Sequence, residues 1–133
     1  MTQTNKDIVE AIFAASAEQD WATVKSYLHD RLTVHEADSL PYRGTFVGPD
    51  QFIELNAQVA ATWEGTSTSV DHLLADGDHV VVLGTMNGTG KATGLAFQMP
   101  FAAVWRFEQG QVVEIRPYYF DTDLLRRVHG TSD

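Results

Sequence analysis

Residues 97–107 alternate large apolar side chains with other residues, and this alternation constrains the fold more than any other feature of the sequence. A period of two places the apolar side chains on one face of a β-strand. A strand of about ten residues belongs to a long, bent sheet, and such bulky side chains fill a deep core or line a hollow against helices. We expect the function to lie in that hollow. The alternating side chains are Phe97, Met99, Phe101, Trp105 and Phe107.

The length of 133 residues predicts one domain, residues 1–133. A chain of this size can bury roughly two thirds of its unfolded surface in one core. The sequence has no cysteine, which excludes a disulfide framework, a thiolate zinc site and a cysteine nucleophile.

Charge and hydropathy exclude two classes of partner. The formal net charge is -9, and the lysines and arginines are scattered, so we expect no binding to nucleic acid. No apolar run approaches the ~18 residues that span a bilayer, and no basic segment precedes an apolar one as in an export signal. We expect a cytoplasmic protein that does not bind membranes.

Three helices are expected in the first half of the sequence. Thr4, with Asp7 three residues later, is typical of a helix start. Asp20 can cap a second, short helix, and Pro49 fits the first turn of a third. The expected elements are helices over residues 4–18 and 20–30, a strand over 32–36, a loop over 38–48 and a helix from 49 onward.

The second half carries long β segments joined by turn residues. Residues 76–78 (Asp-Gly-Asp) and 109–110 (Gln-Gly) have the composition that hairpins require, so these strands should be antiparallel. A last short helix should start at Asp121 or Thr122. The expected strands cover residues 67–75, 79–89, 96–108 and 112–120. Helices followed by such strands predict an α+β domain with helices across one face of a curved sheet.

Three segments in this order resemble the nuclear-transport-factor-2-like superfamily. They are residues 19–21 (QDW), residues 40–48 (LPYRGTFVG) and residues 104–115 (VWRFEQGQVVEI). Within the superfamily, the sequence looks most like SnoaL-like and ketosteroid-isomerase-like proteins. The resemblance implies a cone-shaped fold with a curved mixed or antiparallel sheet on three N-terminal helices and a short C-terminal helix. It also implies a conical pocket and frequent homodimerisation through the outer face of the sheet.

The same resemblance implies particular site residues. The ketosteroid isomerase pattern has a carboxylate base at the end of the first strand, which is Glu36 here. Its oxyanion hole uses a tyrosine and a neutral aspartic acid. Ile12 and Ala103 occupy those approximate positions, so we do not expect steroid isomerisation itself. The cyclase-like pattern has an acid/base aspartate at the end of the last strand, which is Asp121 here.

Strand parity and local context leave the roles of both carboxylates open. Tyr119 and Asp121 share one side of the last strand, and if that side faces inward they line the pocket together. A carboxyl group among aromatic rings there would lose hydration and move protons near neutral pH. Asp121 can equally cap the last helix. Glu36 can equally lie in solvent or pair with Arg43.

Neither a metal nor a cofactor is expected. No spacing of histidines and carboxylates matches a metal site. Residues 88–91 (Gly-Thr-Gly-Lys) lack the full Walker spacing and the following helix, which favours a hairpin connection over a phosphate loop.

We therefore expect an enzyme that moves protons in a small, largely apolar, polyketide- or steroid-like molecule, as an isomerase, a cyclase or a hydratase-like lyase. The alternative is a ligand-binding or structural homodimer without chemistry, paired through a strip that includes Ala102 and Val104. The candidate catalytic residues are Asp121, Glu36 and Tyr119. The candidate ligand contacts are Phe13, Trp21, Phe52, Val59, Met99, Phe101, Trp105 and Ile115.

Overall fold

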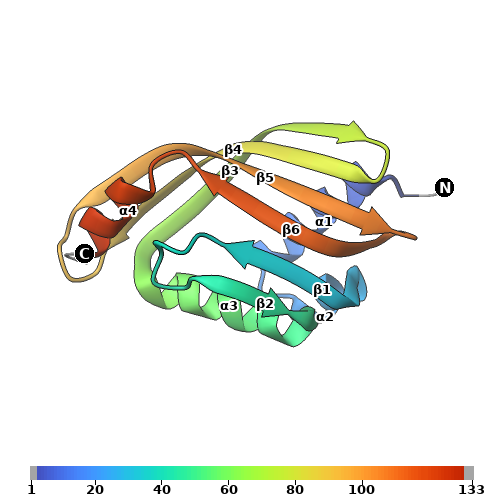
Figure 1. Ribbon diagram of the computed structural model, residues 1–133, viewed down its shortest axis with the longest axis horizontal. Helices are drawn as coiled ribbons and strands as arrows, with labels where there is room; N and C mark the ends of the chain where they lie inside the picture. Colours follow the sequence, from blue (N-terminus) through green and yellow to red (C-terminus); the bar gives the residue numbers. More distant parts are fainter. Residues whose placement is uncertain (1–2, 131–133) are drawn as a thin grey trace.

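The computed structural model describes residues 3–130, in which helices lie against one face of a six-stranded sheet (Figure 1). Helices α1 and α3 both contact the sheet, and α2 contacts α1. The elements are α1 (Asn5–Ala17), α2 (Trp21–Ser26), β1 (Leu28–Glu36), β2 (Gly44–Val47), α3 (Gly48–Thr62), β3 (Trp63–Asp76), β4 (His79–Gly90), β5 (Ala96–Glu108), β6 (Gln111–Tyr119) and α4 (Thr122–His129).

The sheet is mixed and strongly bent. Its strand order is β2-β1-β6-β5-β4-β3. Strands β1 and β6 pair in parallel, and every other neighbouring pair is antiparallel. At the far end, the β4–β5 hairpin curls over and α4 lies against it (Figure 1). This α+β architecture confirms the fold class predicted from the sequence.

The helices begin where the sequence predicts. Thr4 and Asp7 form a reciprocal capping box on α1, with side-chain to backbone distances of 3.0 and 3.1 Å. The side chain of Asp20 accepts a hydrogen bond from the backbone N–H of Thr23 and caps α2. Pro49 lies in the first turn of α3, where its missing N–H costs nothing.

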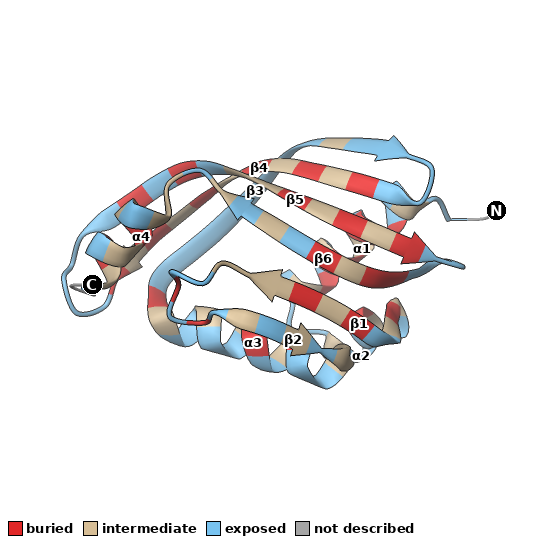
Figure 2. Cartoon of the chain, in the orientation of Figure 1, coloured by how far each residue is buried: buried red, intermediate tan, exposed pale blue. Residues whose placement is uncertain are grey.

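Strand β5 shows the predicted alternation. Phe97, Met99 and Trp105 are buried on the face toward the helices, and the burial of β4 alternates in the same way (Figure 2). Glycine makes room for one of the rings. Phe101 pairs with Gly84 across the ladder, and a Cβ at Gly84 would lie 2.8 Å from Cε1 of the Phe101 ring. The aromatic ring therefore lies directly on the neighbouring strand.

The structure corrects the expected boundaries around β1. Helix α2 ends at Ser26 and β1 begins at Leu28, so residues that were expected to finish the helix belong to a strand. Leu28 pairs with Val112 of β6, a tertiary contact that overrides the local helical period. The expected loop over residues 38–48 also contains β2, a four-residue edge strand. Proline and glycine around β2 obscure it in the sequence.

The core lies between the sheet and the helices. Fully enclosed side chains such as Val9, Leu32 and Val82 come from a helix and from two strands. No helix within residues 3–130 is both long enough and apolar enough to cross a membrane. The bent sheet thus encloses an apolar interior, and the candidate site lies at one end of it.

Candidate active site

Glu36 and Tyr119 meet at the wide end of the interior. Tyr119 donates its hydroxyl hydrogen to Oε1 of Glu36 at 2.7 Å. The pairing of β1 and β6 makes this contact possible: Val34 is the register partner of Ile115, and both point inward. Side chains two residues apart share a face of a strand, so Glu36 and Tyr119 point inward as well. The structure thus brings together two of the three candidate catalytic residues.

The carboxyl group of Glu36 is tuned to neutral pH. Burial raises its pKa to about 7, although the hydrogen bond from Tyr119 acts in the opposite direction. Desolvation disfavours the charged form, whereas a donor to the carboxylate favours it, and here desolvation has the larger effect. A group with a pKa near the working pH is populated in both protonation states, so it can accept and return a proton.

Two further residues, Tyr42 and Trp63, surround this pair, and the sequence analysis did not single them out. Tyr42 is buried, and its hydroxyl oxygen accepts a hydrogen bond from Nε1 of Trp63 at 3.0 Å. Burial, opposed by that bond and reinforced by the charge of Glu36, raises the pKa of Tyr42 to about 12. Burial and the same charge also hold the pKa of Tyr119 well above its ordinary value. Both phenols therefore remain hydrogen-bond donors around an ionisable carboxyl group.

Asp121 has a different local role in the structure. Its Oδ1 accepts the backbone N–H of Leu124 at 3.0 Å, and Asp121 is the N-cap of α4. Strand β6 ends at Tyr119, two residues earlier. The capping role foreseen as one alternative is therefore present. Proton transfer by Asp121 stays a prediction.

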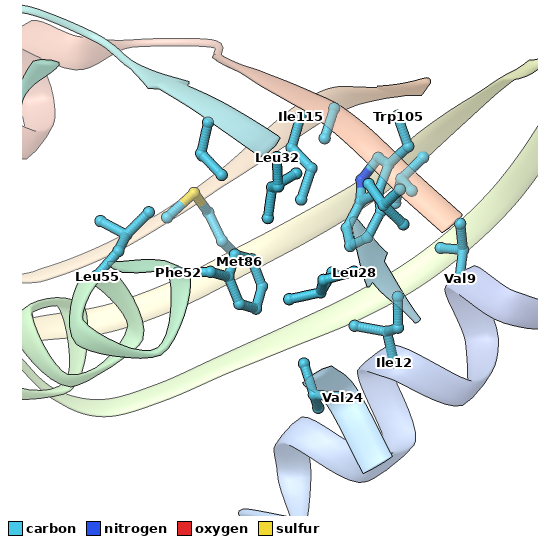
Figure 3. Packing of buried hydrophobic residues seen from close by; sticks show 14 of the residues in the cluster. Val9, Ile12, Val24, Leu28, Leu32, Phe52, Leu55, Met86, Trp105 and Ile115 are labelled. Atoms are coloured by element: carbon cyan, nitrogen blue, oxygen red, sulfur yellow. The ribbon is translucent and has the colours of Figure 1, made fainter. Parts of the chain in front are cut away.

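The expected ligand contacts are part of the apolar cluster. Figure 3 shows Phe52, Trp105 and Ile115 packed with aliphatic side chains from α1, α2 and β1. Some members are fully buried, and others are half-buried at its margin. The buried ones are Phe52, Met99, Trp105 and Ile115, and the half-buried ones are Phe13, Trp21, Val59 and Phe101.

A cavity of about 350 Å³ lies outside that cluster, and Tyr42 forms part of its wall. It is bounded by the loop before β2, the end of α3, the β4–β5 connection and the end of α4. None of the eight expected ligand contacts lines it. Because Tyr42 also interacts with Glu36, it separates this cavity from the Glu36–Tyr119 pair. The lining residues are Pro41, Tyr42, Gln58, Ala61, Thr62, Lys91, Ala92 and His129.

The outer face of the sheet carries a separate charged cluster. Nε2 of His35 lies 3.1 Å from Oε2 of Glu114, and Arg116 lies 3.4 Å from the same oxygen. Burial of Glu114 opposes its ionisation, but the hydrogen bonds from His35 and Arg116 outweigh it and lower its pKa. Within residues 3–130, no three histidines and carboxylates gather as they would around a metal ion.

A family model described as a SnoaL-like domain matches residues 9–115. Patulin synthesis protein F of Aspergillus clavatus is 28% identical over 100 residues, which are 74% of this chain and 48% of that protein. The chain thus spans about half the length of this curated relative.

Solved structures share the fold over almost the whole chain. An NTF2-like protein from Burkholderia thailandensis is 27% identical, with a TM-score of 0.88, and the match covers 96% of this chain and 98% of the other. TerC, co-crystallised with polyporic acid, is 21% identical with a TM-score of 0.85, and the match covers 96% of this chain and 98% of TerC.

Proposed function

The chain belongs to the SnoaL-like domain family, and from this premise we propose that it catalyses proton transfer in a small, largely apolar organic molecule, with Glu36 as the group that carries the proton. One observation carries the proposal: a half-buried carboxyl group at the end of the apolar interior has a pKa of about 7. Perturbed carboxyl groups of this kind are common at catalytic sites. Isomerisation, cyclisation and hydration all need such a group.

The proposed cycle balances without a redox partner. The carboxylate of Glu36 takes a proton from a carbon next to a carbonyl group, and the electron pair of the broken C–H bond moves onto the carbonyl oxygen. The carboxylic acid then returns the proton to the same or to a conjugated carbon. Tyr119 fixes the carboxyl group through its hydrogen bond and is a positioning residue in this scheme.

Two comparisons support a small organic ligand. A relative is named for patulin synthesis, and a structural neighbour was co-crystallised with polyporic acid. We propose a ligand of similar chemistry, with rings and several oxygen atoms, for this chain. The apolar cluster would contact its ring body.

Exchange of hydrogen for deuterium tests the proposal without knowledge of the natural substrate. The bicyclic ketone 2-decalone in D2O at pD 7 should exchange its α-protons faster with the protein than without it, as followed by NMR. Glu36→Gln should abolish the acceleration. The exposed carboxylate variant Asp123→Asn is the matched control and should retain it. Acceleration that survives Glu36→Gln would refute the proposal, and its loss in Asp121→Asn would assign the proton to Asp121 instead.

A second candidate function is ligand binding without chemistry. Ile12 and Ala103 are buried and apolar at the positions where the isomerase pattern has its oxyanion donors. A protein with this function would bind 2-decalone but give no accelerated exchange.

We also propose that two copies pair through the outer face of the sheet. Leu74 and Tyr118 are 55% and 53% exposed there, beside the half-buried Ala102 and Val104. An apolar strip of this kind is costly to leave in water. Sedimentation at micromolar protein should give a dimer, which Leu74→Glu should dissociate, whereas a monomeric parent protein would contradict the pairing.

A further inference from the structure

Trp105 carries a buried hydrogen-bond donor that the fold does not satisfy. Its side chain is 5% exposed, and its indole Nε1 has no acceptor within residues 3–130. In that part of the chain it is the only buried side-chain nitrogen or oxygen in this condition. Figure 3 shows this nitrogen among the carbon atoms of the core. Native proteins leave few such groups unpaired, and each one calls for a reason.

The neighbouring Trp63 shows that this fold can satisfy a buried indole. Nε1 of Trp63 donates to the hydroxyl oxygen of Tyr42 at 3.0 Å. Both tryptophans are buried and have the same donor, yet only Trp63 has a protein acceptor. An unpaired buried N–H forfeits its hydration without compensation. A phenylalanine at position 105 would fill most of the same space without that penalty.

Trp105 faces the same interior as Glu36. It is the register partner of Ile115 on β6, which is in turn the partner of Val34 on β1. Glu36 lies two residues beyond Val34. Two strand spacings across the sheet and two residues along it separate the α-carbons of Trp105 and Glu36 by roughly 12 Å. Side chains that project into the interior from both positions leave room for a ligand with two fused rings between them.

We propose that the indole N–H of Trp105 binds an acceptor oxygen of the ligand, at the end remote from the atoms that exchange a proton with Glu36. The proposal rests on the proposed function and specifies its substrate class. The substrate has an apolar ring body, an acidic C–H next to a carbonyl group at one end, and a carbonyl or similar oxygen at the other.

The chemistry of Trp105 gives this recognition a direction. A site with a buried donor rejects analogues that lack the acceptor, because binding them leaves the donor unpaired. Phe13 forms one wall beside the indole: the two ring centroids are 5.9 Å apart, and Phe13 is only half-buried. A single phenyl ring thus separates this part of Trp105 from the surface.

Two matched ketones test the proposal. Decalin-2,6-dione has a carbonyl group at each end of a fused-ring body, whereas 2-decalone has only one. In titration calorimetry the parent protein should bind the dione about tenfold more tightly, since a hydrogen bond is worth about that factor. Trp105→Phe should remove this preference and leave the affinity for 2-decalone within about twofold. A purely structural tryptophan would weaken both ligands alike.

A second measurement needs no variant. In protein labelled with 15N at its tryptophans, the indole proton signal of Trp105 should shift downfield when the dione binds. The signal of Trp63 should stay in place because its donor is already bonded to Tyr42. No dione binding at millimolar concentration, equal affinities of the parent protein for both ketones, or an unmoved Trp105 signal would each overturn the proposal.

Failure of this proposal is distinguishable from failure of the proposed function. If the dione preference is absent but Glu36→Gln still abolishes exchange of 2-decalone, proton transfer stands and the role of Trp105 falls. If the preference is present but exchange is independent of Glu36, the role of Trp105 in recognition stands and the catalytic assignment falls.

Discussion

The hydroxyl group of Tyr119 and the carboxyl group of Glu36 are 83 positions apart in the sequence and 2.7 Å apart in the structure. This hydrogen bond joins the ends of two parallel strands, β1 and β6, at the end of an otherwise apolar interior. It fixes the direction of a carboxyl group that burial makes reluctant to ionise. The predictions on Glu36 and Tyr119 depend on the balance between that burial and that hydrogen bond.

Glu36→Gln should stabilise the protein at alkaline pH. The pKa of Glu36 is about 7 in the folded protein and 4.5 in an ordinary glutamate. The folded state therefore binds the proton more tightly, and stability falls as the pH rises from below 4.5 through 7. A shift of this size corresponds to about 3 kcal/mol. The glutamine side chain of the variant stays neutral and can still accept the hydrogen bond from Tyr119, so the variant's free energy of unfolding should lack this fall.

Urea unfolding at pH 4, 6 and 8 measures the difference. The variant and the parent protein should agree at pH 4 and diverge progressively above it. Glu54→Gln, at an exposed position of α3, is the matched control and should follow the parent profile. Parallel profiles for Glu36→Gln and the parent protein would contradict the raised pKa.

Tyr119→Phe should raise the pKa of Glu36 further. The hydroxyl hydrogen bond is the influence that lowers this pKa against the effect of burial, and phenylalanine removes it while keeping the ring. The carboxyl 13C signal of Glu36 should therefore titrate at higher pH than in the parent protein. At pH 8 the variant should also lose about 1–3 kcal/mol of stability because the carboxylate loses its donor. An unchanged titration midpoint would show that the bond is absent in solution.

The sequence predicts most of the fold because the deciding patterns are local. The alternation of residues 97–107 defines β5, and the Thr4–Asp7 capping box defines the start of α1. Strand β2 could not be predicted, since four residues between glycines acquire their structure from pairing with β1. The parallel pairing of β1 with β6 is likewise a long-range property that local periodicity does not contain.

The candidate site was only partly visible in the sequence. Glu36 and Tyr119 were candidates, but their contact depends on the register between strands distant in sequence. Tyr42 lies in a loop without periodicity, and Trp63 lies at the junction of α3 and β3, so neither position carried a signal of its own. The Pro41-Tyr42-Arg43-Gly44 stretch does mark a loop beside the interior, and an aromatic residue there was the available clue.

Tyr42→Phe should destabilise the protein by about 1–3 kcal/mol, because it leaves the buried Nε1 of Trp63 without its acceptor. Trp63→Phe removes the donor instead and also loses the edge contact between Trp63 and Phe97, whose ring centroids are 5.0 Å apart. The double variant should cost less than the sum of the two single changes. A double-mutant cycle by urea unfolding measures this coupling, and strict additivity would contradict it.

Asp121→Ala should cost about 1 kcal/mol of stability, whereas Asp121→Asn should cost only a few tenths. The carboxylate caps α4 by accepting the N–H of Leu124, and an asparagine side-chain oxygen can accept the same bond while alanine cannot. The comparison separates capping from charge at this position. Thermal unfolding of both variants measures it, with Asp123→Asn as a neighbouring control outside the cap. Equal losses for alanine and asparagine would mean that the negative charge of Asp121, and not its hydrogen bond to Leu124, supports the end of the sheet where α4 lies.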